Sequence, residues 1–178
     1  MHLIVVRRDL TGFQHLHPTM NADGTWAVPV TLPEAGSYRV FADFKHDGTA
    51  QTLGSDLAVD GKASYRALPA QGSQARTDGY EVELAGGTSS AGAESELGFA
   101  VSRDGEAVPV EPYLGADGHL VALREGDLAF LHVHPIETGG GAIRFGTEFP
   151  SEGDYRLFLQ FKDEGRVHTA AFTRAVTR

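Results

Sequence analysis

Short runs of alternating apolar and polar residues, rich in β-branched and aromatic side chains, recur along the chain between Gly, Pro, Asp and Asn residues. No window shows the 3.6-residue period of an amphipathic helix, so the pattern predicts an all-β protein. Turn signals such as Asp47-Gly48 separate the runs. In the first part of the chain we expect strands near His2–Arg7, Phe13–His17, Thr25–Thr31, Ser37–Lys45 and Ala50–Val59.

The second part of the chain follows a stretch with little apolar periodicity, which we interpret as a linker over residues 61–78. Further strands are expected at Tyr80–Leu84 and Glu94–Val101, before a final series that starts at Gly118. Seven or so strands over roughly a hundred residues are typical of an immunoglobulin-like β-sandwich. We therefore predict tandem immunoglobulin-like β-sandwich units at residues 1–60 and 79–178.

An internal duplication supports this division. His2 and His119 are related by an offset of 117 residues, and the same offset relates two later histidine pairs and a run of Pro, Gly, Tyr, Arg, Phe and Lys positions. A period this long indicates tandem domains and not a solenoid. The second unit has about forty residues before its repeated part, whereas the first has none. We expect the first unit to lack its opening strands, which an upstream segment or another chain would supply, for example in a homodimer.

Three histidines are predicted to converge in the second unit. If Glu125-Gly126 form a two-residue hairpin loop, His119 lies directly opposite His132, with the two Cβ atoms about 5 Å apart on one face. His134 lies two residues beyond His132 and so shares that face. Three imidazoles at one point are a ligand set that a divalent transition metal can use.

The first unit repeats this arrangement with His2, His15 and His17. Because apolar residues share the predicted face, we expect each cluster on the inward face at one end of its sandwich. The predicted metal ligands are therefore His119, His132 and His134 in the second unit and His2, His15 and His17 in the first. The alternative is packed histidines that bond to the backbone or to one another.

Other polar residues are weaker candidates for the site. His46 and His168 are not duplicated, while Glu111 and Tyr113 precede His119 and could assist it. Two further tyrosines match the tyrosine-corner position of sandwich folds and are interpreted as structural, namely Tyr38 and Tyr155.

Composition limits the chemistry. The 178 residues include no cysteine and two methionines, which excludes thiolate sites and disulfides and disfavours a thioether-rich Cu(I) site. Imidazole ligands suit Cu(II), our first choice, and Zn(II), our second. A net charge of −9 argues against nucleic acid and anionic membrane surfaces as partners. No membrane span or signal peptide is visible in the sequence.

The segments His2–Val6, Asp9-Leu10, Phe13, His15–Pro18 and Leu32–Tyr38 resemble a family of bacterial exported β-sandwich domains. Domains of that family often occur beside heavy-metal-binding modules and membrane-linked copper-handling systems. The resemblance covers Met1 to about Val59 and Gly118 to about Val176. It implies an extracytoplasmic protein, secreted, periplasmic or at the cell surface, that is not an enzyme and handles copper or another heavy metal.

Two enzyme families share fragments of the pattern. Gly126 and His132-Val133-His134 match the opening of a cupin metal motif, but Glu137 comes one or two residues too early and the second half-motif is missing. His-Val-His also resembles copper/zinc superoxide dismutases, which need further ligands and a disulfide. We therefore predict metal sequestration or delivery. A spacer module that binds a protein partner without metal, and a cupin-like metal oxidoreductase, are the alternatives.

Overall fold

The computed structural model describes residues 1–136 and 142–178, and in these ranges every regular element is a β-strand. The predicted fold class, all-β with tandem immunoglobulin-like β-sandwich units, is confirmed. The chain divides into one compact unit at Met1–Ala67 and another at Leu68–Arg178. No helix in the described ranges could cross a membrane.

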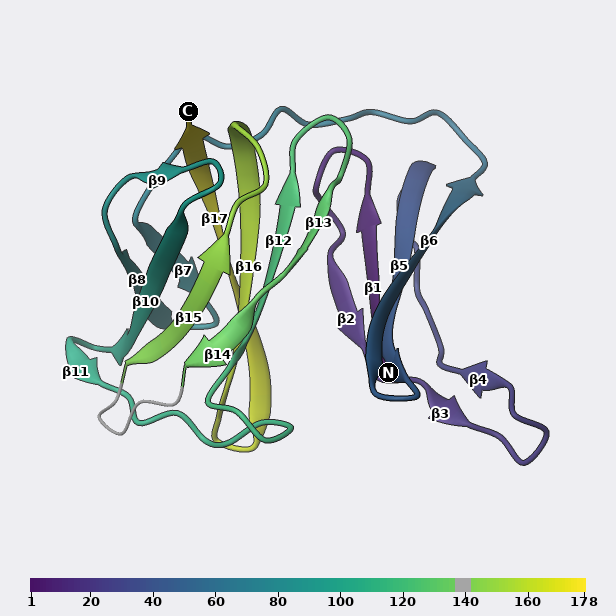
Figure 1. Ribbon diagram of the computed structural model, residues 1–178, viewed down its shortest axis with the longest axis horizontal. Helices are drawn as coiled ribbons and strands as arrows, with labels where there is room; N and C mark the ends of the chain where they lie inside the picture. Colours follow the sequence, from purple (N-terminus) through teal and green to yellow (C-terminus); the bar gives the residue numbers. More distant parts are fainter. Residues whose placement is uncertain (137–141) are drawn as a thin grey trace. The chain divides into compact units, whose positions relative to one another are not determined.

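The first unit is built on one antiparallel sheet with the strand order β2-β1-β5-β6 (Figure 1). A separate two-stranded hairpin, β3-β4, accompanies this sheet. The strands of the first unit are β1 (His2–Arg7), β2 (Gln14–Leu16), β3 (Thr19–Met20), β4 (Trp26–Ala27), β5 (Gly36–His46) and β6 (Thr49–Val59). The predicted strand boundaries agree closely at β1, β5 and β6, whereas the strand expected at Thr25–Thr31 shrinks to two residues.

The second unit has two sheets that form a sandwich (Figure 1). One sheet has the order β14-β15-β10-β8-β7, with β11 paired to β10, and the other has the order β13-β12-β16-β17-β9. The strands are β7 (Gln74–Thr77), β8 (Tyr80–Ala85), β9 (Ser89–Ser90), β10 (Glu94–Arg103), β11 (Glu106–Ala107), β12 (His119–Arg124), β13 (Phe130–His132), β14 (His134–Ile136), β15 (Ile143–Glu148), β16 (Gly153–Asp163) and β17 (Arg166–Thr177).

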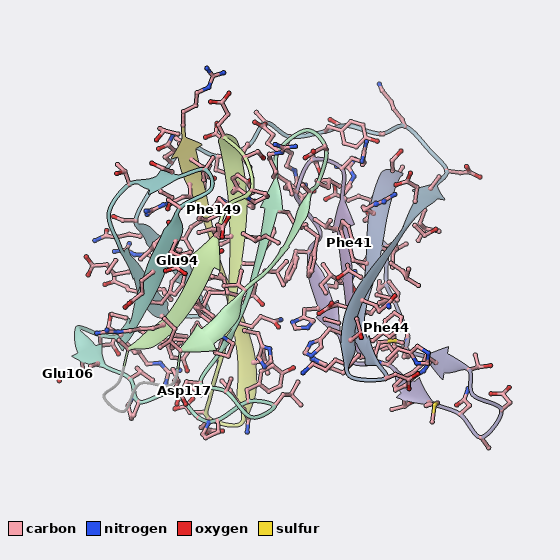
Figure 2. All side chains as sticks on the ribbon, in the orientation of Figure 1. Phe41, Phe44, Glu94, Glu106, Asp117 and Phe149 are labelled. Atoms are coloured by element: carbon pink, nitrogen blue, oxygen red, sulfur yellow. The ribbon has the colours of Figure 1, made fainter. Side chains whose placement is uncertain are left out.

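The core of the second unit lies between these sheets, where alternate residues of each strand meet. Phe99 and Phe145 from one sheet and Leu157 and Phe161 from the other are fully buried. Phe149, labelled in Figure 2, joins the same cluster and packs edge-on against Tyr155. The period of two that predicted the strands therefore also selects the side chains that fill the sandwich.

The predicted linker over residues 61–78 is wrong at its end, because Gln74–Thr77 forms β7 and pairs with β8. The turn between these strands is Asp78-Gly79, and both residues have positive φ, as a type I′ hairpin requires. The sequence did not predict β7, because its residues show no alternation of apolar and polar side chains. Pairing with β8 decides its conformation.

Both predicted tyrosine corners are confirmed. The Tyr38 hydroxyl donates a hydrogen bond to the Glu34 carbonyl at 2.8 Å, and the Tyr155 hydroxyl donates to the Ser151 carbonyl at 3.0 Å. Both tyrosine side chains are buried, so the polar tip of each ring is satisfied inside the fold.

Arg7 fixes the end of β1 in the first unit. This residue is 1% exposed, and its guanidinium donates to Asp9 at 2.8 Å and to the carbonyl oxygens of Ala35 and Ser64 at 2.7 and 3.0 Å. The guanidinium carbon also lies 4.6 Å from the centre of the Tyr65 ring. Arg7 therefore ties β1 to the chain that follows β6.

We expect the Arg7→Met variant to lose about 3–5 kcal/mol of unfolding free energy, because it leaves the buried Asp9 carboxylate without its cation. The control is Arg66→Met, which breaks an exposed pair with Glu34 and should cost no more than about 1 kcal/mol. Urea unfolding followed by the fluorescence of Trp26, the single tryptophan, measures both values. Equal losses in the two variants would contradict the role given to Arg7.

Candidate metal centre

The histidine hairpins have a register that differs by two residues from the predicted one. In the first unit Leu3 pairs with Leu16 and Ile4 with His15, and the same register continued past the end of β2 would bring His2 opposite His17. In the second unit Val121 pairs with His132, where His119 was expected. A slip of two residues preserves the face on which each side chain lies, so the predicted face survives although the predicted partner of His2 is wrong.

A carboxylate inside each loop explains the slip, because it favours a four-residue connection. Asp9 accepts hydrogen bonds from the Thr11 hydroxyl and amide at 2.6 and 3.3 Å. Asp127 accepts from the Ala129 amide at 3.1 Å and from the Arg124 side chain. Such side-chain bonds to a backbone amide two residues later stabilise a turn of their own.

These bonds also lower the pKa of each of the two carboxyl groups. Burial raises the pKa of Asp9, but hydrogen bonds from Thr11 and Arg66 and the charge of Arg7 together hold it below its usual value. The hydrogen bond from Arg124 lowers the pKa of Asp127 to about 2. Both loops therefore carry ionised carboxylates at neutral pH.

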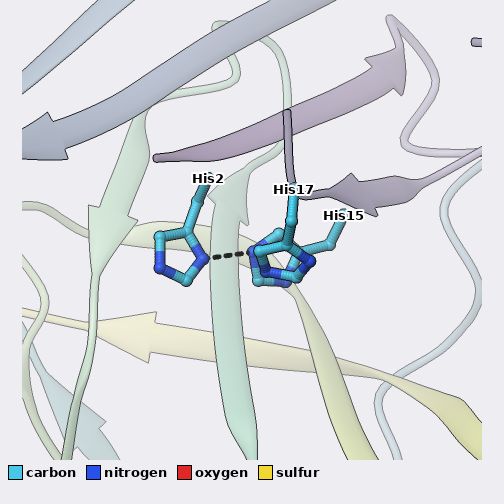
Figure 3. Close-up of side chains that lie close together, drawn as sticks. All are labelled: His2, His15 and His17. Atoms are coloured by element: carbon cyan, nitrogen blue, oxygen red, sulfur yellow. Dashed lines mark hydrogen bonds between the residues drawn. The ribbon is translucent and has the colours of Figure 1, made fainter. Parts of the chain in front are cut away.

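His2, His15 and His17 bring their rings together in the first unit (Figure 3). The ring centres are 4.9 Å apart for His2 and His15, 5.0 Å for His2 and His17 and 4.7 Å for His15 and His17. One nitrogen from each ring lies within 4.8 Å of the other two. All three residues are partly buried, so water has limited access to them.

One contact of the cluster defines a protonation requirement. The Nδ1 atom of His2 lies 2.7 Å from the Nε2 atom of His15, and one of these nitrogens must donate a proton to the other. A metal bound to both nitrogens would need two lone pairs. The donor ring must therefore carry its proton on the other nitrogen when a metal binds.

Asp43 lies beside the cluster on the next strand. It pairs directly with His2 across β1 and β5, and directly opposed residues share a face with Cβ atoms about 5 Å apart. Asp43 is 8% exposed, and its Oδ1 atom accepts a hydrogen bond from the Thr52 hydroxyl at 2.9 Å. The sequence pattern did not single out Asp43, because the second unit has Gln160 at the equivalent position.

The corresponding histidines of the second unit do not share one strand. His132 ends β13, which pairs with β12, whereas His134 begins β14, which pairs with β15 of the other sheet. Val133, 7% exposed, enters the core where the chain changes sheets. The prediction that His132 and His134 belong to one strand is therefore wrong, and their side chains lie outside the described residues.

His119 is held by the segment that precedes it. Its Nε2 atom lies 2.9 Å from the Tyr113 carbonyl oxygen, and the two rings meet edge-on with centres 5.2 Å apart. Burial lowers the pKa of His119, although the hydrogen bond to Tyr113 opposes the shift. Tyr113, one of the weaker candidates, thus contacts the histidine that it was expected to assist.

The face of the second unit that carries His119 is not the inward one. The core of the sandwich contains Leu120 and Ala122, which alternate with His119, Val121 and Leu123 along β12. The predicted location of this histidine on the inward face is therefore wrong. Val121 and Leu123 are buried all the same, at 5% and 0% exposure, which explains why the apolar pattern alone did not distinguish the two faces.

The remaining candidates have structural contacts. His168 is buried and its Nδ1 atom lies 2.8 Å from Asp78, while Glu111 pairs with Lys162 at 2.9 Å and accepts a hydrogen bond from the Gly165 amide. His46 is exposed next to Asp47. The glutamate that a cupin motif would need, Glu137, lies outside the described residues.

Comparisons with known proteins extend this description. A family described as "Domain of unknown function (DUF8832)" matches residues 1–61 and 75–178. No curated protein sequence matches the chain. Among solved structures, a chimeric titin Z1Z2-Z1Z2 tandem functionalized with a GRGDS peptide from fibronectin is similar at 14% identity and a TM-score of 0.29, over 98% of this chain and 82% of that one.

The environment of His119 predicts a pH dependence of stability. Because burial lowers its pKa in the folded state, the unfolded chain binds more protons, and stability should fall as the pH drops below about 6.5. We expect the His119→Gln variant to lose less stability than the unmodified chain between pH 7.5 and pH 5.5, as measured by urea unfolding. His46→Gln, at an exposed position, is the control and should leave the pH dependence unchanged. An unchanged slope in His119→Gln would contradict the prediction.

Proposed function

The chain belongs to the family of domains of unknown function DUF8832, and we propose that it binds a divalent transition metal through His2, His15 and His17. The observation that carries the proposal is the approach of one nitrogen from each of these rings to within 4.8 Å of the other two. A histidine that serves only to pack needs partners for its own two ring nitrogens and not for those of its neighbours. Three such rings at one point are better explained by a shared ligand.

The size of the cluster supports this proposal. Zn–N bonds of 2.0–2.1 Å in a tetrahedral site place the ligand nitrogens about 3.3 Å from one another. The nitrogens of His2 and His15, now 2.7 Å apart, would separate slightly, and the 4.8 Å limit on the nitrogen separations is not far above the spacing needed. Rotations of the imidazole rings provide movements of this size. Three protein ligands leave a fourth position for water or another donor.

The composition of the cluster favours Cu(II) first and Zn(II) second. Imidazole suits both ions, and at nitrogen sites the affinity for Cu(II) normally exceeds that for Zn(II). The chain has no cysteine, and Met20 is 61% exposed in the β3-β4 hairpin. The described residues thus provide no thiolate to select Cu(I).

The proposed role is sequestration or delivery of the metal. A partly buried cluster made of imidazoles suits the capture and release of a metal ion. An extracytoplasmic location and a place in copper handling belong to the same proposal, and they rest on the resemblance of the histidine and Leu-Pro-Glu-Ala-Gly segments to exported domains.

Calorimetric titration of the purified chain with Cu(II) and Zn(II) tests the site. We expect one ion per first-unit cluster, with lower affinity below about pH 6.5, because protons compete for the imidazole nitrogens. The double variant His15→Ala, His17→Ala should lose this binding and keep its fold. His46→Ala is the matched control, since it removes an exposed histidine of the same unit.

Each contrary outcome has a clear meaning. Binding that survives the double variant would place the site elsewhere, and absence of binding in the unmodified chain would favour a metal-free spacer module. The predicted second cluster, His119, His132 and His134, has its own test in His132→Ala with His134→Ala. If it is a site, the unmodified chain binds a second ion that this variant loses.

Asp43 provides a further test. Its carboxylate lies next to His2 on the same face, where it can orient the ring and offset the charge of a bound cation. We expect Asp43→Asn to weaken metal binding about 10–100-fold with little change in the far-UV circular dichroism spectrum. Thr52→Val, which removes the hydroxyl that bonds Asp43, should have a smaller effect in the same direction. Unchanged affinity in Asp43→Asn would show that His2 needs no carboxylate neighbour.

A further inference from the structure

One face of the first unit's sheet is apolar. The equivalent face in the second unit is buried inside that unit's own sandwich. On β16 of the second unit, Leu157 and Leu159 face the opposite sheet and are fully buried. The equivalent residues on β5, Val40 and Ala42, are only partly buried, and no strands equivalent to β7, β8 and β10 accompany them in the first unit. The first unit therefore keeps one layer of the sandwich and leaves its inner face incompletely covered.

What remains of the second layer is the β3-β4 hairpin. Thr19 pairs with Ala27 in the same register in which Ile136 pairs with Arg144 in the β14-β15 hairpin. Most of the large exposed apolar side chains belong to the first unit, namely Met20, Trp26, Val30, Leu53, Leu57 and Tyr65. Two of them, Leu53 and Leu57, lie on β6 at the border of the sheet.

β6 is an unprotected edge strand of 11 residues. Within the part of the chain that the structure describes, no strand pairs with its outer edge, and all its residues from Thr49 to Ala58 are exposed. Its duplicate β17 carries Arg166 and Arg174, and charges of this kind discourage edge pairing. The only charged residue of β6 is Asp56, which pairs with Arg39 on the neighbouring strand.

We propose that β6 pairs antiparallel with β6 of a second copy of this chain, around a two-fold axis at Ser55. Antiparallel pairing of a strand with its own copy is self-complementary, so both copies contribute the same surface and the assembly closes as a dimer. The two four-stranded sheets then become one continuous sheet. The proposal is independent of metal binding, since it involves none of the three histidines.

The apolar side chains select this register. With Ser55 opposite its own copy, Leu53 of each chain lies opposite Leu57 of the other, and these are the two exposed leucines of the strand, at 59% and 41% exposure. Cross-strand pairs of apolar side chains are the main source of register preference in sheets. A register centred one residue later would place Asp56 opposite its own copy, which like charges disfavour.

The charges are also complementary in this register. Asp56 comes opposite Gly54 of the second copy, and the guanidinium of Arg39 lies over Gly54 in each chain, close to where a Cβ atom would be. Each Asp56 therefore approaches the partner's Arg39 in addition to its own, which is 3.0 Å away. A partner of different sequence would not supply both the leucine pairs and this second ion pair.

The absence of cysteine from the chain allows a direct test by disulfide formation. Directly opposed residues in antiparallel strands have Cα atoms about 4.5–5.5 Å apart, which a disulfide can bridge. We expect Ser55→Cys to form a disulfide-linked dimer under mild oxidation. Thr49→Cys, equally exposed on the same strand but far from the proposed axis, is the matched control and should stay largely unlinked.

Sedimentation velocity tests the dimer without a cross-link. The unmodified chain should sediment as a dimer in the presence of a chelator, and Leu53→Asp with Leu57→Asp should sediment as a folded monomer. Val167→Asp, at an exposed position of β17, should remain dimeric. A monomeric unmodified chain at the highest concentration, a dimer that the chelator dissociates, or equal cross-linking at residues 49 and 55 would overturn the proposal.

Discussion

The antiparallel pairing of β1 with its two neighbours is the constraint on which the candidate site depends. Because successive side chains of a strand alternate between faces, the pairing commits His2, Ile4 and Val6 to one face and Leu3, Val5 and Arg7 to the other. The loop carboxylate Asp9 and the buried Arg7 hold the pairing in one register. The convergence of the three imidazoles follows from this register.

The two units show how one sequence pattern functions in two settings. In the second unit the inner face of the repeated sheet is covered by β8, β10 and β15, and the interior is filled by aromatic and aliphatic side chains. In the first unit the covering layer is reduced to the β3-β4 hairpin, and apolar residues remain exposed. The substitutions between the units follow this difference, since the inward Arg174 of the second unit corresponds to the exposed Leu57 of the first.

The proposed metal site and the proposed dimer occupy different parts of the first unit. The proposed ligands lie on β1, on β2 and just after β2, at one side of the sheet, whereas β6 forms its opposite border. Asp43 and Arg39 lie on β5, the strand between β1 and β6, and on the same face as the histidines. Across this face the polar groups are therefore the three imidazoles, then the buried Asp43 carboxylate, then the exposed Arg39–Asp56 ion pair.

The sequence by itself determined the fold class, the duplication, most strand boundaries and the sharing of one face by His2, His15 and His17, because all of these follow from the two-residue period and from a constant offset. Only the tertiary structure decided the loop length of the hairpins, the change of sheet at Val133 and the existence of β7. Loop length depends on the hydrogen bonds that Asp9 and Asp127 accept, and these bonds have no periodic signature. The orientation of His119 away from the core and the position of Asp43 beside His2 depend on which sheet covers which face, and that choice is made by packing between strands far apart in the chain.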